Sequence, residues 1–417
     1  MELKRVVVTG MGALTPLGNT VDEYWNNLVA GVSGADMITL FDASKFRTKF
    51  ACEVKGFDAT KYLDRKEARK IDRFTQFALV VSDQAMADAG LSKDSINPDR
   101  VGVVFASGIG GLITFQHEVT DFARGDGTPR FNPFFIPKMI LDIAAGQISM
   151  RHNLRGPNFA VVSACASSTN AIIEAYNLIR LNKASVILTG GSEAVISEAG
   201  VGGFNAMKAM SERNDDPKTA SRPYDKDRDG FVMGEAAGIL VLEELEHAKA
   251  RGAKIYCEIA GGGATADAHH ITAPHPEGLG AKNVMLVALD DAGMKPEEID
   301  YINTHGTSTP IGDGAEVKAI SQVFGEHAYK LNISATKSMT GHCLGAAGVI
   351  EAIASIKAVM HDTIPPTINH FTDDPELDPG LNFTFNKAQQ RPVRAALSNT
   401  FGFGGHNACV IVKKFTN

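Results

Sequence analysis

The segment Phe159-Ala160-Val161-Val162-Ser163-Ala164-Cys165 is the stretch on which the fold prediction depends. It is an apolar run that ends in small residues and passes into an amphipathic pattern over 167–181, which is typical of a strand followed directly by a helix. Apolar runs and helical patterns alternate along all 417 residues and indicate an α/β protein. We expect strands at 5–9, 101–106, 158–163, 185–189, 238–242, 255–259, 301–303, 332–335, 395–399 and 408–413, and helices at 72–89, 167–181, 280–292 and 345–359.

A second copy of this unit occurs later in the chain. Ser334-Ala335-Thr336 repeats the pattern of Ser163-Ala164-Cys165, and 405–412 resembles 234–241. The two repeats are separated by the same number of positions along the chain. Units of α/β proteins also resemble one another by chance, but two equal spacings at distant points favour a true duplication.

The duplication predicts two similar halves, at 1–250 and 251–417. Matching turns upstream of the repeated strand are separated by a longer stretch of chain, so we expect an insertion in the first half within 111–147. Reactive groups of α/β proteins gather at strand ends. Equivalent strand ends of the two halves are therefore expected to meet and form one site.

Composition excludes several classes of function. The chain has 41 basic and 48 acidic side chains, a net charge of −7, which argues against a nucleic-acid binder. No stretch approaches the ~20 uninterrupted apolar residues of a membrane span, and the first residues lead into a strand without a signal-peptide pattern. The five cysteines are scattered and form no Cys-x-x-Cys pair, so we expect no disulfide framework, no metal site and a cytoplasmic location.

Cys165 is the first candidate for chemistry. The pattern places its thiol at the N-terminus of a helix, where free backbone N–H groups and the helix dipole stabilise an anion. We therefore expect the pKa of this thiol to be lowered. The alternative is a small buried apolar residue, the usual role of a free cysteine, and we favour that alternative for Cys52, Cys257, Cys343 and Cys409.

Two histidines lie in turns rich in small and hydroxyl residues. His305 follows an expected strand, and His342 precedes an expected helix, at the region that the repeat makes equivalent to Cys165. A single histidine is more often structural than catalytic. A cysteine combined with histidines at strand ends, however, suggests acyl transfer through a thioester.

Two further motifs resemble binding sites, but we interpret neither as one. The segment 8–15 begins like a dinucleotide-binding fingerprint, yet Thr15 replaces the third glycine and Pro16 follows, so we do not expect a nucleotide site. His269-His270 lies beside Asp267, but adjacent residues do not face one ion as residues four apart do.

Basic residues recur at helical spacing near residue 70. Such a stripe is usually a solvated face, but on an acidic protein it also suits docking of an acidic partner. The residues are Arg65, Lys66, Arg69, Lys70 and Arg73.

Four motifs in this order resemble the β-ketoacyl-acyl-carrier-protein synthases, and most of all the elongating type II enzymes. The similarity extends from residue 6 to residue 413, and an apolar Ile109 in Ser107-Gly108-Ile109-Gly110-Gly111 is typical of type II. The motifs are Ser163-Ala164-Cys165-Ala166-Ser167-Ser168, His305-Gly306-Thr307-Ser308-Thr309-Pro310-Ile311-Gly312-Asp313, Lys337-Ser338-Met339-Thr340-Gly341-His342 and Gly402-Phe403-Gly404-Gly405. The chain departs from the family pattern at His406 and in the turn after Cys165.

The resemblance implies a thiolase-like duplicated fold in five layers (αβαβα), a homodimer and no cofactor. It implies a decarboxylative Claisen condensation in fatty-acid elongation, in which acyl and malonyl groups carried by acyl carrier protein give 3-oxoacyl-carrier protein, CO2 and free carrier. In this family pattern Cys165 carries the acyl group, and His305 and His342 stabilise the enolate oxygen.

The resemblance also assigns roles to other residues. Lys337 orients the site, and the N–H groups of Cys165 and Phe403 form the oxyanion hole. Phe403 is also the gate. The substrate-binding set is Thr307 and Thr309 for the phosphopantetheine arm, Ile109 and Phe204, which line the acyl pocket together with Phe403, as well as Phe401 and, as a buried acid, Glu351. Arg65, Lys66, Arg69 and Lys70 are the expected carrier-protein dock.

Other functions remain open on the sequence. A polyketide or type I ketosynthase would use the same chemistry. A thiolase or a starter-unit synthase would use a different set of polar residues, since here Lys337 and His342 supply a lysine and a second histidine. A non-enzymatic subunit that only shapes a cavity would lack the nucleophile, which is present here as Cys165.

Overall fold

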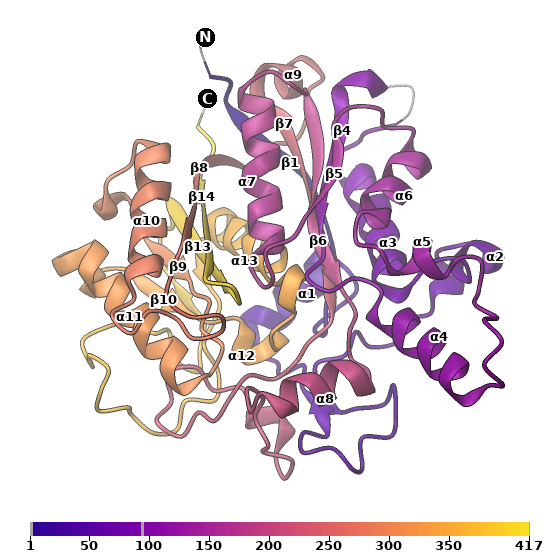
Figure 1. Cartoon of the computed structure of the whole chain (residues 1–417). Helices are drawn as coiled ribbons and strands as arrows, with labels where there is room; N and C mark the ends of the chain where they lie inside the picture. The colour runs from indigo at the N-terminus through magenta and orange to yellow at the C-terminus, as the bar shows by residue number, and fades with distance from the viewer. Residues whose placement is uncertain (1–2, 93–95, 417) are drawn as a thin grey trace.

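The computed structural model describes residues 3–92 and 96–416 (Figure 1). The strands are β1 (Val6–Leu14), β2 (Asp36–Met37), β3 (Phe50–Ala51), β4 (Val101–Ala106), β5 (Asn158–Val161), β6 (Val186–Glu193), β7 (Ala236–Glu244), β8 (Cys257–Ala266), β9 (Tyr301–Asn303), β10 (Asn332–Ser334), β11 (Thr363–Ile364), β12 (Gln389–Gln390), β13 (Ala395–Gly402) and β14 (His406–Lys413). The α-helices are α1 (Val21–Val29), α2 (Arg65–Ala68), α3 (Arg73–Asp88), α4 (Leu112–Arg124), α5 (Phe135–Met139), α6 (Ile143–His152), α7 (Ser167–Arg180), α8 (Glu198–Ala206), α9 (Leu245–Ala250), α10 (Leu279–Ala292), α11 (Pro310–Phe324), α12 (Lys337–Thr340) and α13 (Ala347–His361).

Two half-sheets of the same design form the centre of the molecule. One has the strand order β5-β4-β6-β7-β1, and the other has the order β10-β9-β13-β14-β8. In each half the first three strands are parallel, and the last two are antiparallel to their neighbours. The shared order and directions confirm the predicted duplication of an α/β unit.

The half-sheets join where β1 pairs with β8. The pairs Val6–Ile259, Val7–Glu258 and Val8–Cys257 connect them into one ten-stranded sheet. Helices α7 and α13 lie between the half-sheets and contact strands of both. Helices α3 and α6 cover the outer face of the first half-sheet, and α10 and α11 cover that of the second, which completes the five layers (Figure 1).

Helix α13 is the most buried helix of the central layer. Residues Leu344–His361 are long and apolar enough to cross a membrane by composition, but 89% of that window is buried inside the protein. A helix packed on two sheets must be apolar on all sides. Its composition is therefore explained by its place between the half-sheets.

The equal spacing of the repeated segments has a structural explanation. Strand β6 and its counterpart β13 begin at Val186 and Ala395, and they lie further apart in the chain than β7 and β14, which begin at Ala236 and His406. The second half has a long segment between α13 and β13, and the first half has a long segment with α8 between β6 and β7. These two insertions compensate, so the spacing returns to its earlier value at β7 and β14.

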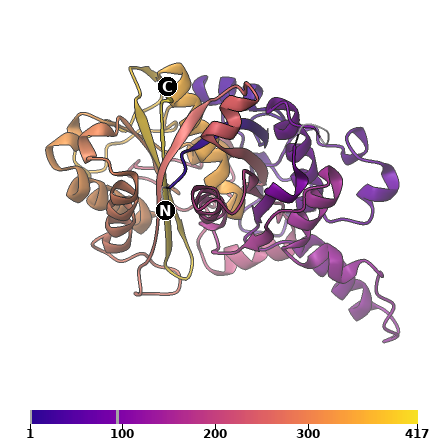
Figure 2. The same ribbon diagram turned by 90° about the horizontal axis from the view of Figure 1, so that it is seen from above.

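The connection between β4 and β5 also differs from its counterpart. It contains three α-helices, α4, α5 and α6, whereas only α11 lies between β9 and β10. Helix α4 and the following loop extend away from the body of the protein (Figure 2). In the second half the connection between β9 and β10, which contains His305, is therefore shorter.

Candidate active site

Cys165 lies in the sharp turn between β5 and α7. Ala164, just before it, has a left-handed φ of 51°, which a small side chain tolerates better than a bulky one. Ser167 fixes the turn, because its Oγ accepts from Ser163 N at 2.8 Å and donates to the carbonyl of Ala164 at 2.6 Å. The thiol is therefore presented at the N-terminus of α7, as the sequence predicts.

The end of β13 lies directly against this turn. A Cβ on Gly402 would lie 2.6 Å from the carbonyl oxygen of Ser163 and 3.1 Å from the nitrogen of Cys165. Only glycine permits this approach. The backbone N–H groups of Phe403 and Cys165 both act to lower the pKa of the Cys165 thiol, against the effect of burial. Two converging N–H groups form a cradle for a negatively charged oxygen.

Two imidazoles of the second half line the same cavity as the thiol. Nε2 of His342 lies 3.0 Å from Sγ of Cys165. The ring of His305 is nearly perpendicular to that of His342, with 5.3 Å between the centroids, and the ring centroid of Phe401 lies 5.4 Å from that of His305. Backbone hydrogen bonds with Val232 and Gly234 hold His342 in place. The duplicated halves therefore bring the predicted cysteine and histidines together.

The protonation state of this group differs from the sequence-based expectation. Burial raises the pKa of the Cys165 thiol to about 12, although Lys337 and the two N–H groups act in the opposite direction. Burial, with a further contribution from Lys337, lowers the pKa of His342 and of His305 well below 6.5. The expectation of a lowered thiol pKa is therefore wrong for the resting site, because desolvation outweighs the helix terminus. The Cys165 thiol and the two imidazoles are therefore all neutral in the resting site.

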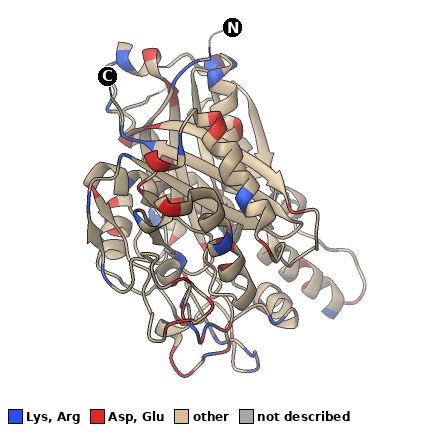
Figure 3. Ribbon diagram, turned by 90° about the vertical axis from the view of Figure 1, so that its left-hand side faces the viewer, with Lys and Arg blue, Asp and Glu red and all other residues tan. Residues whose placement is uncertain are grey.

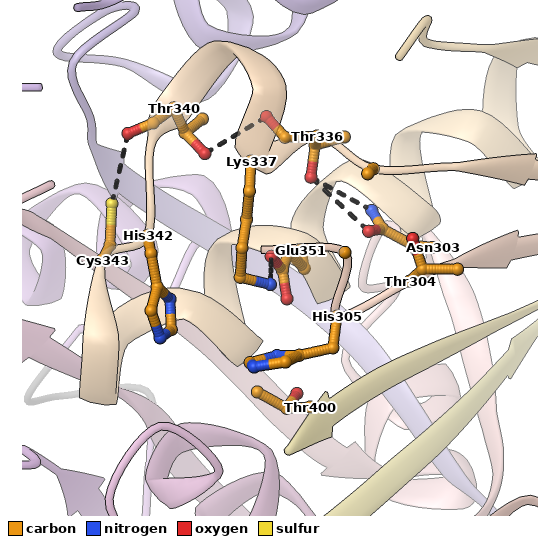
Figure 4. A network of polar contacts seen from close by, with 12 residues as sticks. Asn303, Thr304, His305, Thr336, Lys337, Thr340, His342, Cys343, Glu351 and Thr400 are labelled. Atoms are coloured by element: carbon orange, nitrogen blue, oxygen red, sulfur yellow. Dashed lines mark hydrogen bonds and ion pairs between the residues drawn. The ribbon is translucent and has the colours of Figure 1, made fainter. Parts of the chain in front are cut away.

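A buried ion pair lies behind the imidazoles. Lys337, only 1% exposed, pairs with Glu351, and its side chain lies near both His305 and His342 (Figure 4). Burial raises the pKa of Glu351 to about 7, while Lys337 opposes this shift. Lys337 thus places a positive charge near both rings, which is why it contributes to their low pKa values.

A cavity of about 400 Å³ reaches the thiol. Its wall includes Cys165, both histidines, Phe204, Phe401, Phe403, Thr307 and Thr309. The hydroxyls of Thr307 and Thr309 are 3.0 Å apart. Exposed Met207 and Ile311 also belong to the wall, so the cavity opens to the surface.

Three of the predicted residues do not line this cavity. Lys337 and Glu351 are buried behind it, and Ile109 lies in an apolar cluster that also contains Cys165, Leu112 and Phe204. Phe403 lies 6.3 Å from Phe204, ring to ring. An acyl chain on Cys165 would therefore need room that this cluster now fills.

Sequence reasoning missed two buried carboxylates that shape the site. Glu193, at the end of β6, accepts from N–H groups of residues 108–110 and from Gly345 N. Glu316, in α11, accepts from the N–H groups of His305 and Gly306, both at 2.9 Å. Each therefore fixes the turn after a central strand. The signal that the sequence offered was a single acidic residue among apolar or small neighbours.

The first of the two motifs that resemble binding sites lies inside a strand. Residues 8–14 are buried within β1, so they form no phosphate-binding turn. No group of three or more metal-binding side chains occurs within 3–92 and 96–416. The five cysteines are free and buried.

The basic stripe is shorter than predicted. Helix α2 ends at Ala68, and Arg73 leaves the stripe because its guanidinium turns inward to Glu235, at 2.6 Å. The four remaining residues are exposed, and among the described residues none of them pairs with a carboxylate: Arg65, Lys66, Arg69 and Lys70. On the face of the second half, by contrast, basic and acidic residues are mixed (Figure 3).

Comparison with known proteins agrees with this geometry. Residues 3–248 match the N-terminal domain of the β-ketoacyl synthases, and residues 256–371 match their C-terminal domain. This chain belongs to the β-ketoacyl synthase family. Such a match over both halves confirms the resemblance that the sequence motifs indicate.

Relatives within the family agree over the full length of this ketosynthase. It is 50% identical over 415 residues to 3-oxoacyl-[acyl-carrier-protein] synthase 2 of Synechocystis sp., covering 100% of this chain and 99% of the relative. It is also 50% identical over 412 residues to the enzyme of that name from Staphylococcus aureus, covering 99% of each.

Solved structures support the same fold. A β-ketoacyl synthase from Burkholderia phymatum superimposes with a TM-score of 0.91 at 37% identity and covers 99% of this chain and 100% of that one. A type II polyketide ketosynthase, solved with its acyl carrier protein and a bound hexaketide, gives a TM-score of 0.91 at 32% identity with the same coverage. The predicted thiolase-like fold is thereby confirmed.

Proposed function

We propose that this chain elongates fatty-acyl groups by decarboxylative condensation of acyl-carrier protein with malonyl-carrier protein. The observation that carries the proposal is the Cys165 thiol held 3.0 Å from His342 Nε2 beneath two backbone N–H groups. The relatives at 50% identity, which are named 3-oxoacyl-[acyl-carrier-protein] synthase 2, favour this substrate class over the polyketide ketosynthase at 32%.

The first step transfers the acyl group to Cys165. The sulfur attacks the thioester carbonyl of acyl-carrier protein while its proton passes to neutral His342 Nε2. The N–H groups of Cys165 and Phe403 stabilise the oxyanion. The carrier sulfur then leaves and takes the proton from the imidazolium. Free carrier protein departs, and His342 is neutral again.

The second step breaks the bond between the carboxylate and the α-carbon of the malonyl group on the carrier protein. After acylation His342 changes to the tautomer that carries its proton on Nε2. His305 and His342 then donate hydrogen bonds to the thioester oxygen, on which negative charge develops as CO2 leaves. Neutral imidazoles suit this role, and their lowered pKa values keep them neutral. The released electron pair on the α-carbon attacks the Cys165 thioester, the carbon–sulfur bond breaks, and the sulfur takes a proton derived from solvent.

The cavity suits the pantetheine arm and a moving gate. Thr307 and Thr309 present hydroxyls along its wall and bind the amides of the arm. Phe403 closes the acyl side, and Gly404 and Gly405 follow it with φ of 91° and 75°. These glycines allow Phe403 to swing. Its movement away from Phe204 opens the cluster around Ile109 to the acyl chain.

The exposed basic patch at α2, Arg65, Lys66, Arg69 and Lys70, docks the acidic carrier protein. Exposed and unpaired charges of one sign increase encounter rates with an oppositely charged partner. The nearby ring of Phe134 lies 5.5 Å from the Lys70 ammonium and keeps that side chain at the surface.

The chain forms a homodimer through the edge of its sheet. Among the described strands β5 pairs only with β4, so its other edge is free, and Phe159 and Val162 beside it are 38% and 56% exposed. The projecting segment also has exposed aromatic side chains: Phe115, Phe122, Phe131 and Phe134. Free strand edges and apolar patches of this kind are typical of interfaces. Sedimentation of the chain and of Val162→Asp tests this, with a monomeric variant expected.

The function is tested by reconstitution with defined substrates. Hexanoyl- and malonyl-carrier protein are incubated with the enzyme, and CO2 and 3-oxoacyl-carrier protein are measured, with Cys165→Ala as the control. We expect equal amounts of both products, and none of the 3-oxoacyl product with the variant. Condensation with acetyl-coenzyme A but not with malonyl-carrier protein would instead identify a thiolase.

The free buried cysteines are consistent with activity in the cytoplasm.

A further inference from the structure

Asp72 and Thr114 form a buried polar pair outside the site described above. The two residues are 3% and 6% exposed. Asp72 Oδ1 accepts from Phe74 N at 3.3 Å, at the start of α3. Its other oxygen accepts from Thr114 N at 3.1 Å and from Thr114 Oγ1 at 2.5 Å, at the start of α4. One carboxylate therefore caps two helices.

Helix α4 depends on this external cap. Its own N-cap residue, Gly111, has no side chain to accept a hydrogen bond. The first N–H groups of a helix have no partner within the helix, and a nearby negative charge also stabilises the helix dipole. Without Asp72, Thr114 would leave an N–H and a hydroxyl without partners in a buried place, which costs stability locally.

The start of α4 carries the apolar wall beside the thiol. Leu112 is its first residue, and Ile109 lies in the turn just before it; both pack in the cluster that contains Cys165. Glu193 holds this turn from the inside by accepting from Ile109 N at 3.1 Å. Two carboxylates thus fix the wall formed by Ile109 and Leu112: Glu193 holds the N–H of Ile109, and Asp72 holds Thr114.

We propose that Asp72 is a positioning residue for acyl-chain selectivity, because through Thr114 it fixes the Ile109–Leu112 wall against which the acyl chain packs. The inference rests on the proposed function. A wall that is held rigidly discriminates between chains by length, whereas a wall that yields accepts more lengths with similar rates.

The test compares four proteins: the unaltered chain, Asp72→Asn, Thr114→Val and Thr114→Ser. Asp72→Asn removes one acceptor, Thr114→Val removes the hydroxyl at nearly equal volume, and Thr114→Ser keeps the hydroxyl. The value of kcat/KM is measured with a series of carrier-bound acyl primers that runs from butanoyl to hexadecanoyl. Amide hydrogen exchange of residues 107–115 is measured in parallel.

We expect the ratio of kcat/KM between the best and the poorest primer to fall by about tenfold in Asp72→Asn and about threefold in Thr114→Val. Thr114→Ser keeps the original ratio. Residues 107–115 exchange faster in the first two variants, and kcat with the shortest primer is unchanged.

Two results would overturn the proposal. One is an equal loss with all primers, which is the behaviour of a purely structural cap. The other is faster exchange at 107–115 with an unaltered ratio, since the wall would then be loose without consequence. If Asp72→Asn does not fold, Thr114→Val decides alone. Failure of the proposed function would give a different result from failure of this inference, because the unaltered chain would then condense no primer at all.

Discussion

The Nε2 atom of His342 lies 3.0 Å from Sγ of Cys165, although the two residues are 177 positions apart in the chain. Each residue follows a strand of its own half and stands at or near the start of a helix between the half-sheets. Both are buried and neutral in the resting protein, since burial raises the pKa of the thiol and lowers that of the imidazole. The duplication therefore creates a hydrogen-bonded acid and base and not an ion pair.

The neutral pair predicts the pH dependence of acylation. A thiol with a pKa of about 12 stays protonated, and an imidazole with a pKa well below 6.5 stays neutral, throughout pH 7 to 9. The single-turnover rate of Cys165 acylation by acyl-carrier protein should therefore be level in that range. A sigmoidal rise with a midpoint near 8 would show instead that a thiolate forms first.

Replacing Cys165 by glutamine should separate the two half-reactions. The amide carbonyl of glutamine can accept from the N–H groups of residue 165 and Phe403 as an acyl thioester would, but it cannot be acylated. We expect CO2 release from malonyl-carrier protein to continue or increase while 3-oxoacyl product disappears. Loss of both activities in a folded variant would argue against histidine-assisted decarboxylation.

The close approach of β13 makes Gly402 sensitive to any side chain. The Cβ of Gly402→Ala would lie 2.6 Å from the carbonyl of Ser163, so the strand and the Phe403 N–H must move. Removing one oxyanion donor typically lowers kcat by ~100-fold or more, and we expect a loss of that order. Gly146→Ala in α6 is the control, since its Cβ meets no atom within 4 Å. Equal activity of the two variants would contradict the proposed cradle.

Much of this fold could be predicted from the sequence. The apolar runs at β4, β9 and β14 and the helix patterns at α3, α7 and α13 have the periods of their elements, and the paired SAC and SAT segments revealed the duplication. Helices α1, α4, α5, α6, α8, α9 and α11 were not among the predicted helices; in α4 and α5 exposed apolar side chains obscure the helical pattern.

The site was partly predictable. Cys165, His305 and His342 were found because turns rich in small residues follow or precede strands. The direction of the thiol pKa shift could not be predicted, because desolvation depends on all the surrounding elements and not on the helix terminus alone. Glu193 was missed for a similar reason: its partners, Ile109 and Gly345, come from distant parts of the chain.

The ion pair of Lys337 and Glu351 should stabilise the protein only as a pair. Lys337→Ala leaves a carboxylate buried without a counter-charge, which typically costs about 3–5 kcal/mol. The double variant Lys337→Met, Glu351→Leu removes both charges and should recover most of that loss in the free energy of unfolding. Denaturant titration measures both. A double variant less stable than Lys337→Ala would mean that packing and not charge dominates.

Charge reversal at the basic patch should affect only carrier-bound substrates. We expect Arg69→Glu with Lys70→Glu to raise KM for acyl-carrier protein about tenfold or more, while turnover of a short acyl-pantetheine thioester is nearly unchanged. The matched control is Lys330→Glu with Lys387→Glu, which changes the net charge equally at exposed positions elsewhere. Equal losses on both substrates would show that the patch is structural.

The most direct test of the whole account is the site of acylation. The protein is incubated with radiolabelled acyl-carrier protein in the absence of malonyl groups, quenched, digested and mapped by mass spectrometry. One acyl group per chain is expected on Cys165, attached through a thioester that hydroxylamine removes. An acyl group on any of the other four cysteines, or none on the protein at all, would contradict the central claim.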